Sequence, residues 1–133
     1  MSSKTVLIVD DELDMRIFLS TLLETAGYRS VTTRDGHDGV AKAQQNMPDL
    51  IVMDVMMPGE GGVQMYRKLK TDPELASIPV IMLSAVTRDC FFHYLNMLNA
   101  GLPVPIPQPS AYLEKPVAPE RLLSVVKSIL PPP

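Results

Sequence analysis

Five polar residues in this chain are of types that could do chemistry together: Asp10, Asp11, Asp54, Ser84 and Lys115. Each of them lies at or just after the end of a short apolar run. Two unit charges about 4 Å apart repel by about 4 kcal/mol at an effective dielectric near 20, so three carboxylates in one crevice are costly. We expect such a group either to bind a proton or to recruit a cation.

The donor types indicate which cation this would be. Carboxylates with no cysteine and no nearby histidine favour a hard ion, Mg²⁺ or Mn²⁺, over Zn²⁺. The ammonium group of Lys115 and the hydroxyl of Ser84 would complete a holder for phosphoryl oxygens. Since an aspartate carboxylate can accept a phosphoryl group covalently, the set of residues indicates metal-assisted phosphoryl transfer onto an aspartate.

The elements that must position these residues alternate along the chain. Five short apolar runs are predicted as strands, at residues 5–9, 29–33, 50–53, 80–83 and 111–113. Apolar residues at helical spacing follow each of them, around residues 15–26, 36–46, 63–69, 91–98 and 119–129. This order predicts an α/β fold with right-handed crossovers and a parallel sheet that is covered on both faces. The polar residues would meet at the carboxyl edge of the sheet, where such folds bind ligands.

Composition excludes several other classes of protein. The 133 residues suit a single domain, with 46% hydrophobic and 20% charged residues. A net charge of −3 argues against a broad nucleic-acid-binding face. The single cysteine, Cys90, excludes an internal disulfide. Without a long apolar run or a secretory signal, the chain is expected to have no membrane partner and to be cytoplasmic.

Four sequence motifs carry a resemblance to a known family. "VLIVDDE", "DLIVMDVMMPGEGG", "IPVIMLSA" and "YLEKPV", in this order and spacing, resemble bacterial response-regulator receiver domains of the single-domain, chemotaxis-receiver-like kind. The similarity covers about residues 4–130, so residues 1–133 are expected to form one receiver domain. It implies a flavodoxin-like (βα)5 three-layer sandwich with a five-stranded parallel sheet of order 2-1-3-4-5.

The resemblance also implies a role for each polar residue. By position, Asp54 would be the phosphoacceptor. Asp11, Asp54 and the backbone carbonyl of Met56 would ligate Mg²⁺, for which Mn²⁺ can substitute, and Asp10 would lie near the ion or act through water. No organic cofactor is implied.

Two further positions would complete the site and its switch. Lys115 would pair with the phosphoryl group, and Ser84 would bind a phosphoryl oxygen and move inward on activation. Tyr112 matches the aromatic residue that changes rotamer in the family and would then turn inward. The peptide bond between Lys115 and Pro116 is expected to be cis by the same resemblance.

The function implied is that of a response regulator in a two-component phosphorelay. A sensor histidine kinase or a phosphotransfer protein would phosphorylate Asp54. A downstream protein would recognise the changed face of the fourth helix, fifth strand and fifth helix. The protein would be no enzyme beyond Mg²⁺-dependent self-phosphorylation and autodephosphorylation at Asp54. We expect a monomer or a weak homodimer that binds no nucleic acid.

One segment departs from the family pattern. Residues 102–109, "LPVPIPQP", carry proline at every second position, so they can form neither a helix nor a central strand and predict an extended loop. This insertion would lie beside the expected output face. It would either reshape partner recognition there or be an inert surface insertion, and the sequence leaves both interpretations open.

Other functions remain open at the level of sequence. An aspartate-nucleophile phosphohydrolase of the haloacid-dehalogenase type would use Asp10, but it requires an aspartate two residues later, where this chain has Glu12. A receiver-like binding module that no longer depends on phosphorylation is a further alternative, against which the intact set of site residues argues. A nucleotide-binding module is disfavoured, because the chain has neither a Rossmann glycine fingerprint nor a P-loop. Taken singly, an acid after a strand is often only a helix cap.

Overall fold

The computed structural model describes residues 3–55 and 61–131. The strands are β1 (Thr5–Val9), β2 (Arg29–Thr33), β3 (Leu50–Met53), β4 (Val80–Ser84) and β5 (Ala111–Glu114). The helices are α1 (Leu13–Thr25), α2 (Gly36–Asn46), α3 (Gly62–Thr71), α4 (Arg88–Ala100) and α5 (Pro119–Ile129). The predicted elements are therefore confirmed, with ends that differ by a few residues at most.

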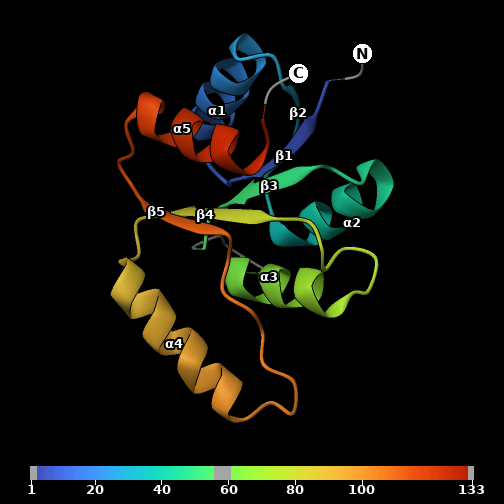
Figure 1. Ribbon diagram of the computed structural model, residues 1–133, viewed down its shortest axis with the longest axis vertical. Coiled ribbons are helices and arrows are strands. Elements are labelled where there is room, and N and C mark those ends of the chain that lie inside the picture. Colours follow the sequence, from blue (N-terminus) through green and yellow to red (C-terminus); the bar gives the residue numbers. More distant parts are fainter. Residues whose placement is uncertain (1–2, 56–60, 132–133) are drawn as a thin grey trace.

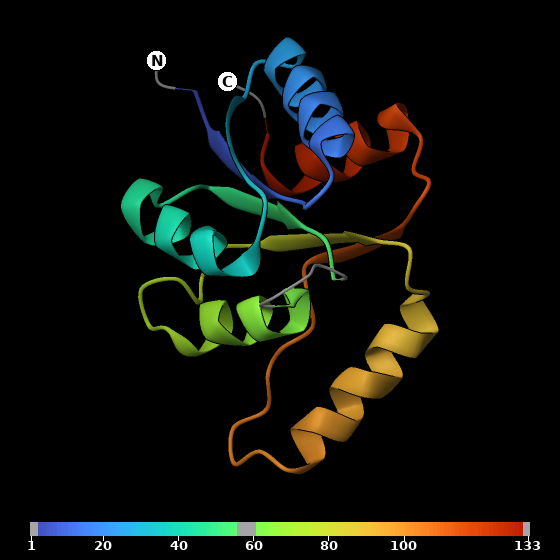
Figure 2. The ribbon, with the colours of Figure 1, turned by 180° about the vertical axis from the view of Figure 1, so that it is seen from behind.

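The five strands form one parallel sheet of order β2-β1-β3-β4-β5. Helices α1 and α5 cover one face, and α2, α3 and α4 cover the other, so the molecule has three layers (Figures 1 and 2). The flavodoxin-like fold and its strand order are thus confirmed. None of the helices in residues 3–55 and 61–131 has the length and apolar character needed to cross a bilayer.

Alternating side chains of the strands supply two separate cores. On β1, Leu7 and Val9 pack on the α2–α3–α4 side, whereas Val6 and Ile8 pack on the α1–α5 side. All four side chains are fully buried. A strand that is buried on both faces consists of consecutive apolar residues, and such a run can be recognised in the sequence as a strand. The first polar residue after each apolar run therefore lies at the edge of the sheet.

The residues that begin and end the helices have the conformations and hydrogen bonds that the sequence predicts. After α1, Gly27 adopts a left-handed conformation with φ of 99°, which an L side chain rarely tolerates. At the start of α2, the Asp35 carboxylate accepts a hydrogen bond from the Asp38 N–H at 2.8 Å. Pro119 occupies the first turn of α5, where its missing N–H costs nothing.

The proline-rich connection between α4 and β5 contains no helix or strand over residues 102–110, as predicted. It runs from the far end of α4 back toward the sheet, alongside α3 (Figure 1). Its middle is not purely superficial, because Ile106 is buried and joins the core on the α3 and α4 side. The sequence did not predict this anchoring.

Candidate functional site

The carboxyl ends of β1, β3 and β5 converge on one lysine side chain. The Lys115 ammonium nitrogen lies 3.0 Å from an oxygen of Asp10 and 2.9 Å from an oxygen of Asp54. Both aspartates are almost fully buried, with 1% and 5% of their surface exposed, whereas the Lys115 side chain keeps 16%. Residues far apart in the sequence thus form one buried, charge-assisted hydrogen-bonded group.

The backbone fixes the two buried aspartates at the edge of the sheet. The Asp54 N–H donates to the Val9 carbonyl and the Asp10 N–H to the Thr33 carbonyl, so each hydrogen bond extends a strand pairing by one residue. The Asp10 carboxylate also accepts a hydrogen bond from the Glu12 N–H at 2.9 Å. These contacts leave the carboxylates little freedom to turn away from each other.

Two opposing effects act on the charge of Lys115. Burial disfavours the ammonium ion, but hydrogen bonds to Asp54 and Asp10 together favour it more strongly, and their nearby charges add to this. The net result raises the pKa of Lys115 above its ordinary value. The lysine is therefore held as a cation beside two carboxylates at neutral pH.

Four acidic side chains gather at this point: Asp10, Asp11, Glu12 and Asp54. One oxygen from each lies within 4.8 Å of the others. Asp11 and Glu12 are exposed, which leaves the cluster open to solvent on one side. An oxygen-only ligand set of this kind fits a hard divalent cation such as Mg²⁺. The third predicted direct ligand, the carbonyl of Met56, lies outside the described residues.

Ser84 and Tyr112 lie next to this group. Ser84 is fully buried at the end of β4, and its carbonyl accepts a hydrogen bond from the Lys115 N–H at 2.8 Å. Its hydroxyl accepts a hydrogen bond from the Val86 N–H at 3.1 Å, while the Tyr112 hydroxyl donates to the Val86 carbonyl at 2.6 Å. The loop after β4 therefore connects the serine to the tyrosine.

Tyr112 already points inward in this structure, although the sequence led us to expect this position only after activation. Only 6% of the residue is exposed, and its ring stacks on Phe91 with 5.0 Å between the ring centres. Burial raises the pKa of the Tyr112 hydroxyl. The peptide bond between Lys115 and Pro116 is cis, as the resemblance implied.

Sequence reasoning missed two contributors to this site. Glu12 joins the acidic cluster and lies 3.8 Å from the Lys115 ammonium, a role that the acidic run at positions 10–12 could have indicated. Gly62 is the other. A Cβ atom at Gly62 would lie 2.2 Å from the Asp54 carbonyl oxygen, so only glycine lets the first turn of α3 pack there. Nothing in a single sequence shows such a close approach.

Comparisons with known proteins agree with this geometry. The family model described as "Response regulator receiver domain" matches residues 6–127. The phosphate regulon transcriptional regulatory protein PhoB of Pseudomonas aeruginosa is 35% identical over 98% of this chain, which spans about half of that protein (53%). The polar-differentiation response regulator DivK of Brucella anthropi is 35% identical and is covered over 96% of both chains. The structure of Vibrio cholerae chemotaxis protein CheY4 superposes with a TM-score of 0.83, at 29% identity, over 97% of this chain and all of that one.

Proposed function

The chain belongs to the response regulator receiver domain family of two-component signalling, and from this premise we propose that Asp54 accepts a phosphoryl group from a phospho-histidine. The donor would be a sensor histidine kinase or a phosphotransfer protein. The observation that supports this is the convergence of Asp10, Asp54 and Lys115 within hydrogen-bond distance at the carboxyl edge of the sheet.

The proposed reaction is an in-line displacement. A carboxylate oxygen of Asp54 forms a bond to phosphorus, while the bond between phosphorus and the imidazole nitrogen of the donor breaks. Lys115 is in place to balance the charge on the phosphoryl oxygens, because its ammonium already contacts the Asp54 carboxylate. The absence of a side chain at Gly62 lets the first turn of α3 lie close to the backbone of the acceptor residue, Asp54. Water would later hydrolyse the acyl phosphate and reset the protein.

The acidic cluster would hold the metal ion that the family uses. Asp11 and Asp54 are proposed as direct ligands, with Asp10 nearby or acting through water, and Met56 is proposed for its carbonyl. Bound Mg²⁺, or Mn²⁺ in its place, would neutralise charge on the transferred group. The protein's role is signalling, and its only chemistry would be this self-phosphorylation and its reversal. We place that role in the cytoplasm.

The signal would leave the site through Ser84 and Tyr112. A phosphoryl group adds up to about −2 charge and new acceptor oxygens. Ser84 would turn from the Val86 N–H toward these oxygens. Because Val86 also holds the Tyr112 hydroxyl, this exchange would change how often Tyr112 occupies its buried position.

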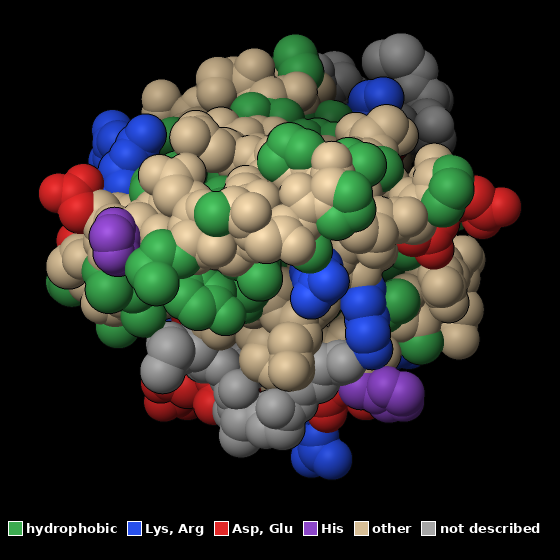
Figure 3. Space-filling model, turned by 90° about the horizontal axis from the view of Figure 1, so that it is seen from below, with side chains coloured by type: hydrophobic (Ala, Val, Ile, Leu, Met, Phe, Trp, Pro, Cys, Tyr) green, Lys and Arg blue, Asp and Glu red, His purple; other side chains and the backbone are tan. Residues whose placement is uncertain are grey.

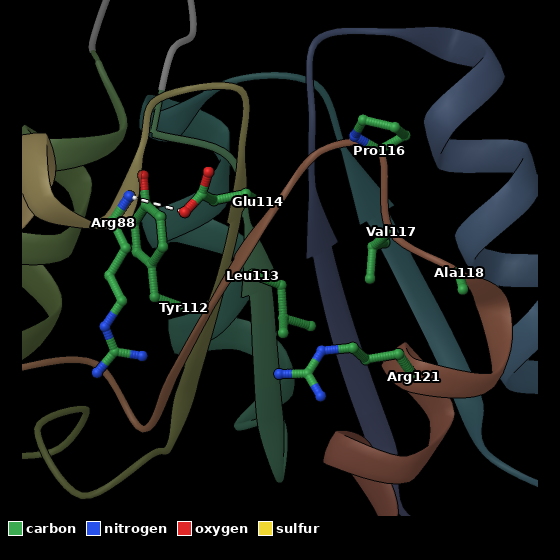
Figure 4. Close-up of a pocket in the computed structure, with 8 residues that line it drawn as sticks. All are labelled: Arg88, Tyr112, Leu113, Glu114, Pro116, Val117, Ala118 and Arg121. Atoms are coloured by element: carbon green, nitrogen blue, oxygen red, sulfur yellow. Dashed lines mark hydrogen bonds between the residues drawn. The ribbon is translucent and has the colours of Figure 1, made fainter.

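The surface that would carry the signal onward is formed by α4, β5 and α5. A hollow of about 350 Å³ lies there, with Tyr112 and Leu113 between the arginines Arg88 and Arg121 (Figure 4). The backbone N–H of Arg88 donates to the Glu114 carboxylate at 3.3 Å beside this hollow. A downstream protein docked here would sense the position of Tyr112 directly.

Intact-mass spectrometry with Mg²⁺ and acetyl phosphate tests the central step. The wild-type protein should gain one labile phosphoryl group, and the Asp54→Ala variant should gain none. Asp38→Ala, which removes an exposed aspartate on α2, is the matched control and should behave as wild type. Equal uptake by wild type and Asp54→Ala, or no uptake by wild type, would contradict the proposal.

A phosphatase assay on the wild type and on an Asp10→Ala variant tests the alternative of a phosphohydrolase. Steady turnover of a phosphate ester that depends on Asp10 would favour that class. The presence of Glu12 two residues after Asp10, in place of the aspartate which that class requires, argues against it.

A further inference from the structure

One long stretch of this chain carries no formal charge. Although 20% of all residues are charged, there is no Lys, Arg, Asp or Glu from Cys90 to Leu113. This stretch comprises α4 after its first turn, the proline-rich segment and most of β5. Figure 3, which views the molecule from below, shows hydrophobic side chains (green) across this face together with some Lys and Arg side chains (blue), while the acidic side chains (red) lie toward the margin.

Within this stretch, α4 presents an apolar stripe to solvent. Cys90, Tyr94 and Met97 follow one another at spacings of four and three residues, so they share one side of the helix. All three are exposed, with 51% of Tyr94 and 64% of Met97 accessible. We call these three residues the α4 stripe. Exposed apolar side chains that form a continuous stripe mark an interaction surface more often than single ones do.

A hollow lies beside the first half of this stripe. Its volume is about 320 Å³, and its described walls are all apolar or aromatic: Val55, Val63, Val86, Cys90, Phe91 and Tyr94. Met97 protrudes from the other half of the stripe, one turn beyond Tyr94. Methionine is flexible and fills irregular apolar spaces well. The same helix therefore offers a protruding apolar side chain and, seven residues earlier, an apolar recess.

The segment after α4 keeps this helix in place. The Asn99 side chain donates to the Ile106 carbonyl at 2.9 Å and accepts from the Ile106 N–H at 2.8 Å. The Tyr66 hydroxyl donates to the Pro107 carbonyl at 2.6 Å, which connects the segment to α3. These contacts hold the helix in place in the free protein. Binding of a partner to the α4 stripe would therefore cause only a small loss of conformational entropy.

We propose that the α4 stripe binds the α4 stripe of a second copy of this chain, with the two helices antiparallel about a two-fold axis near Tyr94. In this arrangement, Met97 of each copy enters the hollow beside Cys90 of the other. Both recesses are filled by one symmetric contact, as an isologous interface requires.

The charge distribution favours this helix for a contact between identical chains. Side chains close to a two-fold axis meet their own copies, so a charged residue there repels itself. Helices α1, α2, α3 and α5 carry charged residues in their middle or last turns, whereas α4 carries them only at Arg88 and Asp89 in its first turn. A chain with net charge −3 can thus approach its copy along α4 without opposing like charges.

This contact and the proposed output surface both involve α4, but the hollows on which they depend share no described residue, and the contact does not rest on phosphorylation. Arg88 and Arg121, which flank the hollow on the α4, β5 and α5 side, take no part in it. The proposal can therefore fail while the proposed function of Asp54 holds, and the reverse is also true.

Sedimentation equilibrium of the full unphosphorylated chain, up to about 1 mM, tests the proposal. The weight-average mass of the wild type should rise with concentration toward twice the monomer mass. Met97→Asp should keep the protein monomeric. Ile17→Asp is the matched control, because Ile17 is a half-exposed apolar residue on α1 and the substitution adds the same charge. It should associate as the wild type does.

Disulfide cross-linking tests whether the proposed two-fold axis lies near Tyr94. In a Cys90→Ser background, Tyr94→Cys should form a disulfide-linked dimer under mild copper-phenanthroline oxidation, and Ile17→Cys should not. A wild-type chain that stays monomeric at every concentration overturns the proposal. So does association that Met97→Asp and Ile17→Asp weaken equally, or cross-linking through position 17 in preference to position 94.

Discussion

The carboxyl edge of the sheet and the α4 region are built on opposite principles. At the sheet edge, Asp10, Asp54 and Lys115 hold one another in place through charge, with Asp11 and Glu12 close by. From Cys90 to Leu113 there is no Lys, Arg, Asp or Glu. Apolar burial and hydrogen bonds between a side chain and the backbone fix that region instead, as at Ile106.

Together with the two proposals above, this difference would separate chemistry from contact within one small domain. A site that moves a phosphoryl group needs charges that are already oriented, and these charges are costly to bury. An uncharged docking surface favours binding, because the removal of water from it costs little free energy. The two regions meet at Val86 and Tyr112, where a change in the first can reach the second.

The largest predicted effect comes from removing the charge that holds the first region together. Lys115→Met leaves the buried Asp10 and Asp54 carboxylates without the ammonium that both contact. Breaking a buried ion pair on one side leaves a costly buried charge, so we expect the free energy of unfolding to fall by about 4 kcal/mol. Urea denaturation at neutral pH without divalent cations measures this.

Lys127→Met is the matched control for that experiment. Lys127 is an exposed lysine in the last turn of α5, and its loss should change stability by less than about 0.5 kcal/mol. Similar losses in both variants would mean that charge does not organise the sheet edge more than it organises the surface.

The second region should instead be sensitive to the volume of one apolar side chain. Ile106→Ala truncates a residue that is only 4% exposed and leaves a cavity under the proline-rich segment. We expect a loss of about 3 kcal/mol by thermal or urea unfolding. Val104→Ala, at a residue that is 77% exposed in the same segment, should cost almost nothing. If both variants were equally mild, the segment would be a surface insertion with no part in the core.

A smaller effect should separate hydrogen bonding from apolar burial in the same segment. Asn99→Ala removes both bonds to the backbone of Ile106 and leaves those buried groups without a side-chain partner. We expect a loss of about 2 kcal/mol. Asn96→Ala, an exposed position one turn earlier, provides the control. No difference between the two variants would show that Ile106 alone anchors the segment.

The sequence predicted the fold and most of the site for a physical reason. Buried parallel strands give continuous apolar runs, and the first charged residue after each run must lie at the edge of the sheet. The runs therefore place Asp10, Asp54 and Lys115 at one edge of the sheet, whereas the strand order that brings them together was implied by the resemblance. The resemblance then supplied their proposed roles.

Other features depend on packing across the chain and left no such signal. The need for glycine at position 62 arises from the Asp54 carbonyl, which approaches from a different element. Asn99 bonds to the backbone of the buried Ile106 and Tyr66 to that of Pro107, and an alternating proline pattern looks the same whether it is exposed or anchored. The inward position of Tyr112 follows from its stacking on Phe91, which the sequence does not show.

The smallest predicted effect is a dependence on alkaline pH that arises where α3 contacts the uncharged region. Burial raises the pKa of Tyr66, whose hydroxyl donates to the Pro107 carbonyl. The folded protein therefore keeps this proton at pH values where the unfolded chain, with an ordinary value of 10.0, has lost it. Stability from this group is complete below pH 10 and falls as the pH rises further.

Tyr66→Phe tests this dependence, because phenylalanine keeps the ring and removes the titrating hydroxyl. Between pH 9 and about pH 11, the wild type should lose about 1 kcal/mol more of its free energy of unfolding than Tyr66→Phe loses. Urea titrations of both proteins at each pH supply the comparison. At pH 7 the variant should be the less stable of the two, since the Pro107 carbonyl has lost its donor, so the two stability curves should converge with rising pH. Parallel curves would show that the Tyr66 hydroxyl titrates alike in the folded and unfolded chains, and that the anchoring of the segment does not depend on pH.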